Sequence, residues 1–284
     1  MPVPSPYPDF ELPNVDLWDF IFRDHGSGER VFPSDTVIYQ QTNDNRRHTF
    51  LGVRDGASQF GEALMQKWSW RKGAVLALLA PNDVDYGIVV YGTLYAGGVI
   101  LPANPDYSAS EFAHMLRDAG VDGVVTHEST LPVAREAMAL AGIPLDRLLL
   151  LGPQGDTDAS LPLHFSKFAQ QATGARRGKQ ALDPDKDLAF LAYSSGTTGL
   201  PKGVMLSHRN LVADILMVRH AVGHNYRWEN DRILGVLPFY HIYGKEATPC
   251  HDVSTYKADI GPRPDWTSTS VIASWDKDAR HAKV

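Results

Sequence analysis

Residues 73–101 read GAVLALLAPNDVDYGIVVYGTLYAGGVIL, with a short apolar run at each end of a longer apolar segment. The spacing predicts a buried strand at 74–79, a helix at 84–96 and a second strand at 99–101. A Pro-Asn-Asp turn separates the first strand from the helix. Gly97, after the helix, takes the left-handed conformation at low cost. A strand, a helix and a strand in this order predict a unit of parallel sheet.

The same alternation continues along the chain. It predicts strands at 123–126, 148–151 and 188–193, and helices at 108–119 and 131–141. Ser108 and Glu111 form a capping box, and Gly142 closes the later helix. Residues 153–185 are richer in polar residues and predict an irregular excursion. Because no repeat of fixed period is present, the pattern favours a layered α/β domain over a solenoid.

The composition is that of a globular protein. The chain has 284 residues, of which 43% are hydrophobic and 21% are charged, so it can bury a sizeable core. A formal net charge of -6 and the lack of a Lys/Arg cluster argue against a nucleic-acid partner. Cys250 is the single cysteine, so an intrachain disulfide is excluded.

The chain ends and the apolar runs bear on location. Residues 1–12 are proline-rich and acidic, unlike a secretory signal. No apolar run approaches the ~20 residues of a membrane span. Residues 282–284 read AKV and differ from the Ser-Lys-Leu peroxisomal address. We expect an intracellular location, cytoplasmic by default, with a peroxisomal one open to a longer form. The sequence gives no expectation for oligomeric state.

Glycines and hydroxyl-bearing residues crowd the segment after the strand at 188–193. Residues 194–203 read SSGTTGLPKG. Glycines let successive backbone N–H groups converge on an anion, hydroxyls add donors, and Lys202 adds positive charge. A solvated linker is the alternative, but linkers are rarely flanked by a buried strand and an apolar run such as residues 204–206. The segment therefore predicts a polyphosphate cradle.

Two other nucleotide-binding motifs fit less well. A Walker loop has Ser or Thr directly after its lysine, whereas Gly203 follows Lys202. A Walker lysine also stands at a helix start, whereas a strand-like run precedes the helix that Ser207 opens here. A Rossmann site needs two glycines one residue apart at a strand end, a spacing absent from Gly52, Gly56 and Gly61.

Residues 193–210, with their SSGTTGLPKGV core, closely resemble the signature loop of the adenylate-forming (AMP-binding) superfamily. Residues 96–105, AGGVILPANP, are similar to an earlier core motif of that family. Residues 238–244, PFYHIYG, resemble a further one in the form used by the acyl-CoA synthetase, 4-coumarate–CoA ligase and luciferase branch. The resemblance covers most of residues 49–244. It implies an α/β fold of layered, mainly parallel sheets.

The resemblance implies a two-step reaction. A carboxylate attacks the α-phosphate of ATP to give an acyl-adenylate and pyrophosphate, and coenzyme A then accepts the acyl group. ATP, Mg²⁺, coenzyme A and a small carboxylic acid are thereby implied. Since such transfers depend on positioning and charge neutralisation, the loop would hold the β- and γ-phosphates while Mg²⁺ bridges them. The implied phosphate-binding residues are Ser194, Ser195, Gly196, Thr197, Thr198, Gly199 and Lys202.

Two further residues take roles from the resemblance. His241 resembles the family histidine beside the acyl carboxylate, and Tyr243 resembles a wall of the acyl pocket. A strand-end histidine satisfied by the backbone is the alternative for His241.

Two other side-chain pairs receive no function. His220 and His224 have the spacing of a two-histidine metal face, but Gly223 weakens the helix there and no third ligand is evident, so a solvated helix end is favoured. No metal site is predicted. Trp68 and Trp70 are expected to be partial core.

The later family motifs cannot be found after Gly244. Residues 245–284 lack leucine and show no helical or strand period. We expect residues 1–48 to be a lead-in and 49–244 an incomplete AMP-binding N-terminal domain. Residues 245–284 are expected to be a disordered non-family tail, from a frame change or a retained intron, with the C-terminal domain absent.

Three interpretations follow from this pattern. The chain is an ATP-dependent carboxylate–CoA ligase recorded incompletely, a truncated product without catalysis, or a non-catalytic nucleotide-binding or regulatory protein derived from the ligase fold. A chain this short would leave an unpaired apolar sheet edge, with instability or aggregation as the expected result.

Overall fold

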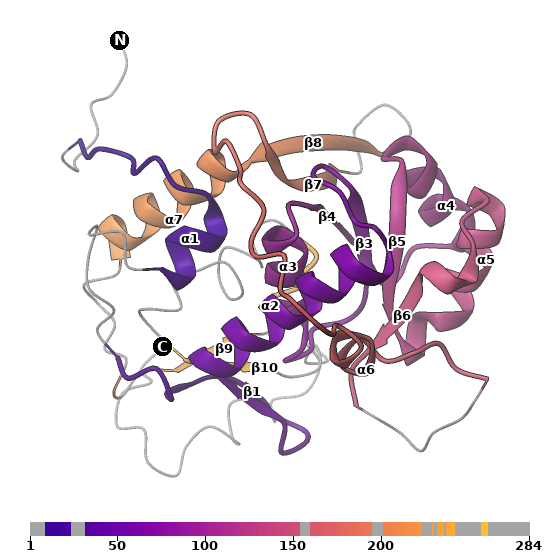
Figure 1. The fold of residues 1–284 in the computed structure, drawn as a ribbon, viewed down its shortest axis with the longest axis horizontal. Helices are drawn as coiled ribbons and strands as arrows, with labels where there is room; N and C mark the ends of the chain where they lie inside the picture. The colour runs from indigo at the N-terminus through magenta and orange to yellow at the C-terminus, as the bar shows by residue number, and fades with distance from the viewer. Residues whose placement is uncertain are drawn as a thin grey trace, which may run out of the picture.

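Figure 1 shows the chain as a computed structural model. The structure describes residues 9–23, 32–153, 160–194, 201–222, 229, 232–235, 237–241 and 257–260.

A six-stranded sheet forms the centre of the fold (Figure 1). Its strands are β3 (Val75–Leu79), β4 (Val99–Ala103), β5 (Val121–His127), β6 (Leu148–Leu151), β7 (Leu188–Ser194) and β8 (Lys202–Ser207). The order is β6-β5-β3-β4-β7-β8. The first five strands in this order are parallel to their neighbours, and β8 runs antiparallel to β7. The predicted α/β class with a mainly parallel sheet is therefore confirmed.

Alternation along the strands divides the core into two layers. Leu76 and Leu78 of β3 pack into the larger cluster, on the side of α2 (Phe50–Lys67), α3 (Tyr86–Tyr95) and α6 (Phe165–Gln170). Val75, Ala77 and Leu79 face the other cluster, under α4 (Ala109–Asp118) and α5 (Leu131–Ala141). Because successive side chains point to opposite faces, a strand covered on both faces must be apolar throughout. The sequence of β3 has this pattern.

Close contact between α2 and α3 depends on glycine. A Cβ added at Gly61 would lie 2.6 Å from the carbonyl oxygen of Gly92, and one at Gly92 would lie 2.7 Å from that of Ala57. Real Cβ atoms do not approach this closely, so the two helix backbones meet where neither has a side chain. This contact brings α3 close against α2.

A second sheet joins segments far apart in the chain. Its strands are β1 (Val37–Gln41), β2 (Arg47–Thr49), β9 (Arg232–Gly235) and β10 (Lys257–Ile260), in the order β2-β1-β10-β9. β10 is parallel to both β1 and β9, and β1 and β2 are antiparallel. The helices α1 (Leu17–Phe22) and α7 (His208–Val222) contact each other. Short 3-10 turns span Glu128–Thr130 and Leu145–Arg147.

The local expectations can be compared with this structure. The capping box of Ser108 and Glu111 is formed, and Gly97 and Gly142 have φ of 72° and 74°. Within residues 245–284, expected to be a disordered tail without a strand period, the structure places the short strand β10. Backbone hydrogen bonds to β1 and β9 hold β10, and these do not require a periodic sequence.

The two tryptophans are buried, with Trp68 8% and Trp70 5% exposed, as expected for core residues. Among the described helices, none is long and apolar enough to cross a membrane.

Candidate functional site

The signature loop begins and ends on one hairpin. β7 ends at Ser194 and β8 begins at Lys202, and these two residues are register partners across the hairpin. Both are exposed. The other predicted phosphate-binding residues, Ser195, Gly196, Thr197, Thr198 and Gly199, lie outside the described residues. The strand after Lys202 agrees with the rejection of a Walker loop, whose lysine would stand at a helix start.

A tyrosine ties the base of this hairpin to a neighbouring helix. The Tyr193 hydroxyl, directly before Ser194, donates a hydrogen bond to the Asp118 carboxylate at the end of α4. Burial raises the pKa of Tyr193, and the hydrogen bond to Asp118 raises it further. The tyrosine is therefore protonated at neutral pH and remains a donor to the carboxylate.

The end of β7 lies at the same edge of the sheet as the ends of β3, β4 and β5. These strands are parallel, so the residues at or just after their ends, Asn82, Asn104 and His127 among them, lie with Ser194 along one edge. In open α/β sheets, ligands bind outside the carboxyl ends of the strands. The position of the signature loop agrees with this rule.

The segment that carries His241 reaches this edge from the second sheet. The described residues 237–241 follow β9. Asn82 donates from Nδ2 to the carbonyl oxygens of Gly235 at 2.9 Å and Leu237 at 2.8 Å. Its Oδ1 accepts a hydrogen bond from the Phe239 N–H at 2.8 Å. One side chain therefore holds three backbone groups of this segment.

A turn then presents His241. The His241 N–H donates to the Pro238 carbonyl oxygen at 3.1 Å. The Phe239 ring, 1% exposed, packs edge-on against Tyr86 of α3, with ring centroids 5.7 Å apart. His241 itself is exposed. Tyr243, the other predicted pocket residue, lies outside the described residues.

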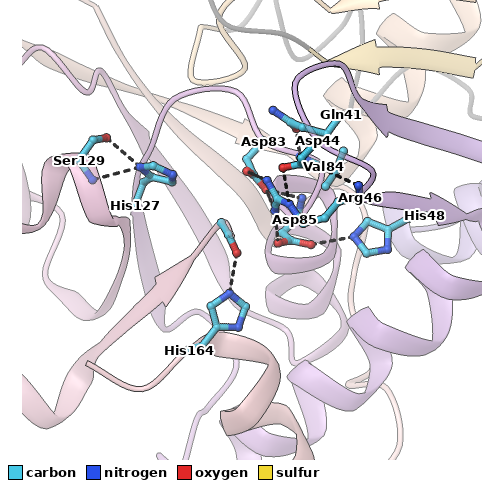
Figure 2. Close-up of polar contacts among 11 residues, drawn as sticks. Gln41, Asp44, Arg46, His48, Asp83, Val84, Asp85, His127, Ser129 and His164 are labelled. Atoms are coloured by element: carbon cyan, nitrogen blue, oxygen red, sulfur yellow. Dashed lines mark hydrogen bonds and ion pairs between the residues drawn. The ribbon is translucent and has the colours of Figure 1, made fainter. Parts of the chain in front are cut away.

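Figure 2 shows how the residues after Asn82 join the two sheets. Arg46 of the β1–β2 hairpin binds Asp83 at 2.6 and 3.0 Å and Asp85 at 2.9 Å. His48 Nε2 lies 2.7 Å from Asp85 Oδ1. The Val84 N–H donates to Gln41 Oε1 at 3.2 Å. Residues 82–85 therefore contact both β1–β2 and the His241 segment, and we call them the hub loop.

The two carboxylates of the hub loop share one cation. Burial alone would lower the pKa of Arg46, but hydrogen bonds and charge from Asp83, with those of Asp44 and Asp85, raise it. Asp83 and Asp85 are buried. Buried carboxylates need such a partner, since an unpaired buried charge is strongly destabilising. Arg46 thus lets two carboxylates lie at the junction of the sheets.

A cleft of about 420 Å³ opens beside the hub loop, lined by His48, Asp85, His164 and Phe165 among others. His164 Nδ1 accepts from the Ser166 N–H, so its Nε2 donates to the Gly152 carbonyl oxygen at 3.0 Å. Burial lowers the pKa of His164. Nearby His127 Nδ1 accepts from the Ser129 N–H, and burial lowers its pKa too (Figure 2). Both histidines are therefore neutral capping groups.

The described residues hold no cluster of three or more His, Cys, Asp or Glu side chains suited to a metal ion. Within that part of the chain, His220 stacks on Phe10 with centroids 4.5 Å apart. His224 lies outside it. His220 is exposed near the end of α7, which agrees with the solvated helix end favoured by the sequence.

Sequence reasoning missed Asn82, Arg46, Asp83 and Asp85. The Pro-Asn-Asp turn was visible, but its role as a junction was not. A polar run between a buried strand and a buried helix is the signal that could have found it, since buried polar groups are nearly always hydrogen-bonded.

Comparison with known proteins decides the family. The family model described as "AMP-binding enzyme" matches residues 28–250, which is well over half of the chain. The chain belongs to the AMP-binding enzyme family.

Members of this family include relatives with recognisable sequence similarity. A long-chain-fatty-acid–CoA ligase of Bacillus subtilis is 32% identical over 251 residues, or 81% of this chain and 43% of the relative. A 4-coumarate–CoA ligase-like 1 protein of Arabidopsis thaliana is 34% identical over 241 residues, or 84% of this chain and 41% of the relative. The chain thus spans less than half the length of these AMP-binding relatives.

The fold agrees with the family. The crystal structure of a long-chain-fatty-acid–CoA ligase from Archaeoglobus fulgidus superimposes with a TM-score of 0.74 at 22% identity, covering 91% of this chain and 49% of that one. At this identity the likeness concerns the fold. The predicted α/β fold of the AMP-binding family is confirmed over the part that the chain covers.

Proposed function

We propose that this chain carries the phosphate-binding loop and the carboxylate-binding segment of an ATP-dependent carboxylate–CoA ligase. In this function a carboxylate oxygen attacks the α-phosphate of ATP, pyrophosphate leaves, and the acyl-adenylate transfers its acyl group to the thiol of coenzyme A with release of AMP. The substrate is a small carboxylic acid. An intracellular location is part of the proposal, because ATP and coenzyme A are intracellular substrates.

The position of the loop ends carries the proposal. Ser194 and Lys202 face each other across the β7–β8 hairpin, at the edge where the parallel strands end. A lysine at the foot of a loop rich in glycine and hydroxyl groups supplies charge to a polyphosphate whose oxygens the backbone N–H groups bind. We propose Ser194, Ser195, Gly196, Thr197, Thr198, Gly199 and Lys202 as the phosphate-binding residues.

His241 and Tyr243 are proposed for the carboxylic acid. His241 is exposed, and the turn that presents it is anchored to the hub loop, which follows β3 at the same edge as the end of β7. A histidine N–H there would bind the carboxylate oxygen and orient it for attack, since such transfers depend on positioning. Tyr243 is proposed as a wall of the acyl pocket.

Mg²⁺ is proposed to bind the ATP phosphates and no side chain of this protein. Mg²⁺ in phosphate sites is bound by one or two carboxylates together with the phosphates, and the described residues do not include a cluster of metal-binding side chains. We therefore place Mg²⁺ on the ATP phosphates and assign it no residue of this chain. Bound there, it would neutralise charge on the leaving pyrophosphate.

The proposed domain boundaries follow the sequence pattern. Residues 49–244 are proposed as the core of the AMP-binding domain, which agrees with the six-stranded sheet lying wholly inside that range. Residues 1–48 lead into it and 245–284 follow it as a tail. β1 and β10, one from each flanking segment, pair with each other, so both flanks add to the second sheet.

Isothermal titration with Mg·ATP tests the proposed function. We expect the 284-residue chain to bind ATP and Lys202→Ala to weaken binding at least about tenfold, or about 1.4 kcal/mol. The control Lys186→Ala removes an exposed lysine paired with Asp183 and should leave ATP affinity within about twofold. A folded wild-type chain that binds no ATP at millimolar concentration, or equal affinity in the Lys202 variant, would overturn the proposal.

A further inference from the structure

Asn82 is placed to control where His241 lies. It belongs to the hub loop and is not part of any motif by which the family was recognised. Its side-chain amide makes all of its described hydrogen bonds to backbone atoms 153 to 157 residues away. A turn asparagine ordinarily bonds its own backbone two residues on. The amide of Asn82 bonds a distant segment instead.

The geometry uses both ends of the amide. Nδ2 donates to the carbonyl oxygens of Gly235 and Leu237. Oδ1 accepts from the N–H of Phe239, which lies within the turn that ends at His241. Only a side chain with a donor and an acceptor on one planar group can make this set of three hydrogen bonds. Aspartate has the same shape but no donor at neutral pH, so it would keep the Phe239 contact and repel both carbonyl oxygens.

A second anchor lies four residues further along the chain. Tyr86 at the start of α3 is fully buried, and its ring packs edge-on against the buried Phe239 ring. The Phe239 residue is thus held by its backbone to Asn82 and by its side chain to Tyr86. The Pro238–His241 hydrogen bond then closes the turn, and the His241 side chain leaves it on the exposed side.

The loop that carries these anchors is itself held. Asp83 and Asp85 bind Arg46, and the Val84 N–H binds Gln41 (Figure 2). Asn82 is therefore a rigid reference point at the end of the central strand β3, whose two neighbours in the sheet are β4 and β5. The contact to Asn82, in the loop directly after β3, fixes the His241 turn relative to the edge of the sheet.

We propose that Asn82 is a positioning residue for the carboxylate substrate: it holds the Gly235, Leu237 and Phe239 backbone so that His241 faces the acid. The inference rests on the proposed function of His241. Asn82 itself does not contact the reacting atoms. Its effect is on the binding of the carboxylic acid and not on that of ATP, whose phosphates are assigned to the β7–β8 hairpin.

Hydrogen exchange tests the anchoring in the 284-residue chain. Asn82→Ala and Asn82→Asp should speed exchange at least tenfold in peptides covering residues 235–241. The matched control is Asn104→Ala, directly after β4, where Oδ1 accepts from the Asp106 N–H of its own loop in the part of the chain that the structure describes. It should leave those peptides unchanged. Equal protection in wild type and both Asn82 variants, with the fold intact, would overturn the inference.

Ligand titration separates positioning from a merely structural role. The probes are dodecanoate and 4-coumarate. For whichever of the two binds the wild-type chain, Asn82→Asp should raise the Kd at least tenfold, and it should leave the Kd of ATP within twofold. Equal carboxylate Kd values for folded Asn82→Asp and wild type would overturn positioning. Wild type that binds ATP but neither acid would overturn the proposed His241 role and positioning with it, while the exchange result would still decide whether the contacts form.

Discussion

His208 begins α7 with a fully buried ring. Its Nδ1 accepts a hydrogen bond from the Leu17 N–H at 3.2 Å, which joins α7 to α1. Its Nε2 is buried with no hydrogen-bond partner among the described residues. Burial lowers the pKa of His208 to about 4, and the charge of Asp16 opposes this only partly. The ring is therefore neutral at neutral pH.

Acid should weaken the fold through His208. The unfolded chain takes up a proton at this histidine near pH 6.5, and the folded chain does so only near pH 4. The contribution of the neutral His208 ring to the free energy of unfolding is therefore complete above pH 6.5 and is lost as the pH falls towards 4. The loss is at most about 1.4 kcal/mol per pH unit. Urea unfolding at pH 7.5, 6 and 5 should show a steeper decline for wild type than for His208→Asn, which keeps an acceptor for Leu17. Parallel declines would contradict this.

Residue roles of this kind were only partly predictable from sequence. Ser194 and Lys202 could be predicted as phosphate-binding residues because a motif in consecutive residues carries its own chemistry, and that role stays a prediction. Asn82 and Arg46 were not, because their partners lie 153 to 157 and 37 to 39 residues away. A long-range contact between polar side chains leaves no periodic trace in one sequence.

At the scale of elements, the strands of the six-stranded sheet were predictable because burial on both faces requires unbroken apolar runs. Their helices carry capping signals in neighbouring residues, such as Ser108 and Glu111. β10 was missed because its four residues have no such pattern and are held by backbone pairing with β1 and β9. Short strands held by distant partners are not readable from periodicity.

The α2–α3 contact gives a prediction at this scale. Gly61→Ala places a methyl group 2.6 Å from the Gly92 carbonyl oxygen, and overpacking of this kind costs about 1–3 kcal/mol. Gly56→Ala on the same helix meets only the Ile88 side chain at 3.4 Å, so helix propensity should leave it neutral or up to about 1 kcal/mol more stable. Urea denaturation compares the two. Equal effects would show that the helices do not meet as described.

In the whole molecule, the hub loop joins two sheets that are built from different parts of the chain. The six-stranded sheet is built from consecutive strand and helix units, whereas β1, β2, β9 and β10 come from both ends of the chain. Arg46 spans the junction, with Asp83 and Asp85 on the far side. The half-buried Arg46 is therefore a main contact that places the two sheets relative to each other, beside the Val84–Gln41 and His48–Asp85 contacts.

Removal of Arg46 should be severe. Arg46→Ala leaves two buried carboxylates without their cation, and breaking a buried pair in this way costs about 3–5 kcal/mol. The control Arg54→Ala removes an exposed pair with Asp55 and should change stability by less than about 1 kcal/mol. Chemical denaturation measures both free energies of unfolding. A loss for Arg46→Ala no larger than that for Arg54→Ala would contradict the junction.

ATP is proposed to bind at the end of the β7–β8 hairpin. Hydrogen exchange of the 284-residue chain with and without Mg·ATP locates the ligand directly. We predict slower exchange in peptides spanning residues 188–207, no change in α5 at the far side of the sheet, and loss of the ATP effect in Lys202→Ala. Protection confined to the cleft lined by His48 and His164, or none anywhere at saturating ATP, would contradict the claim.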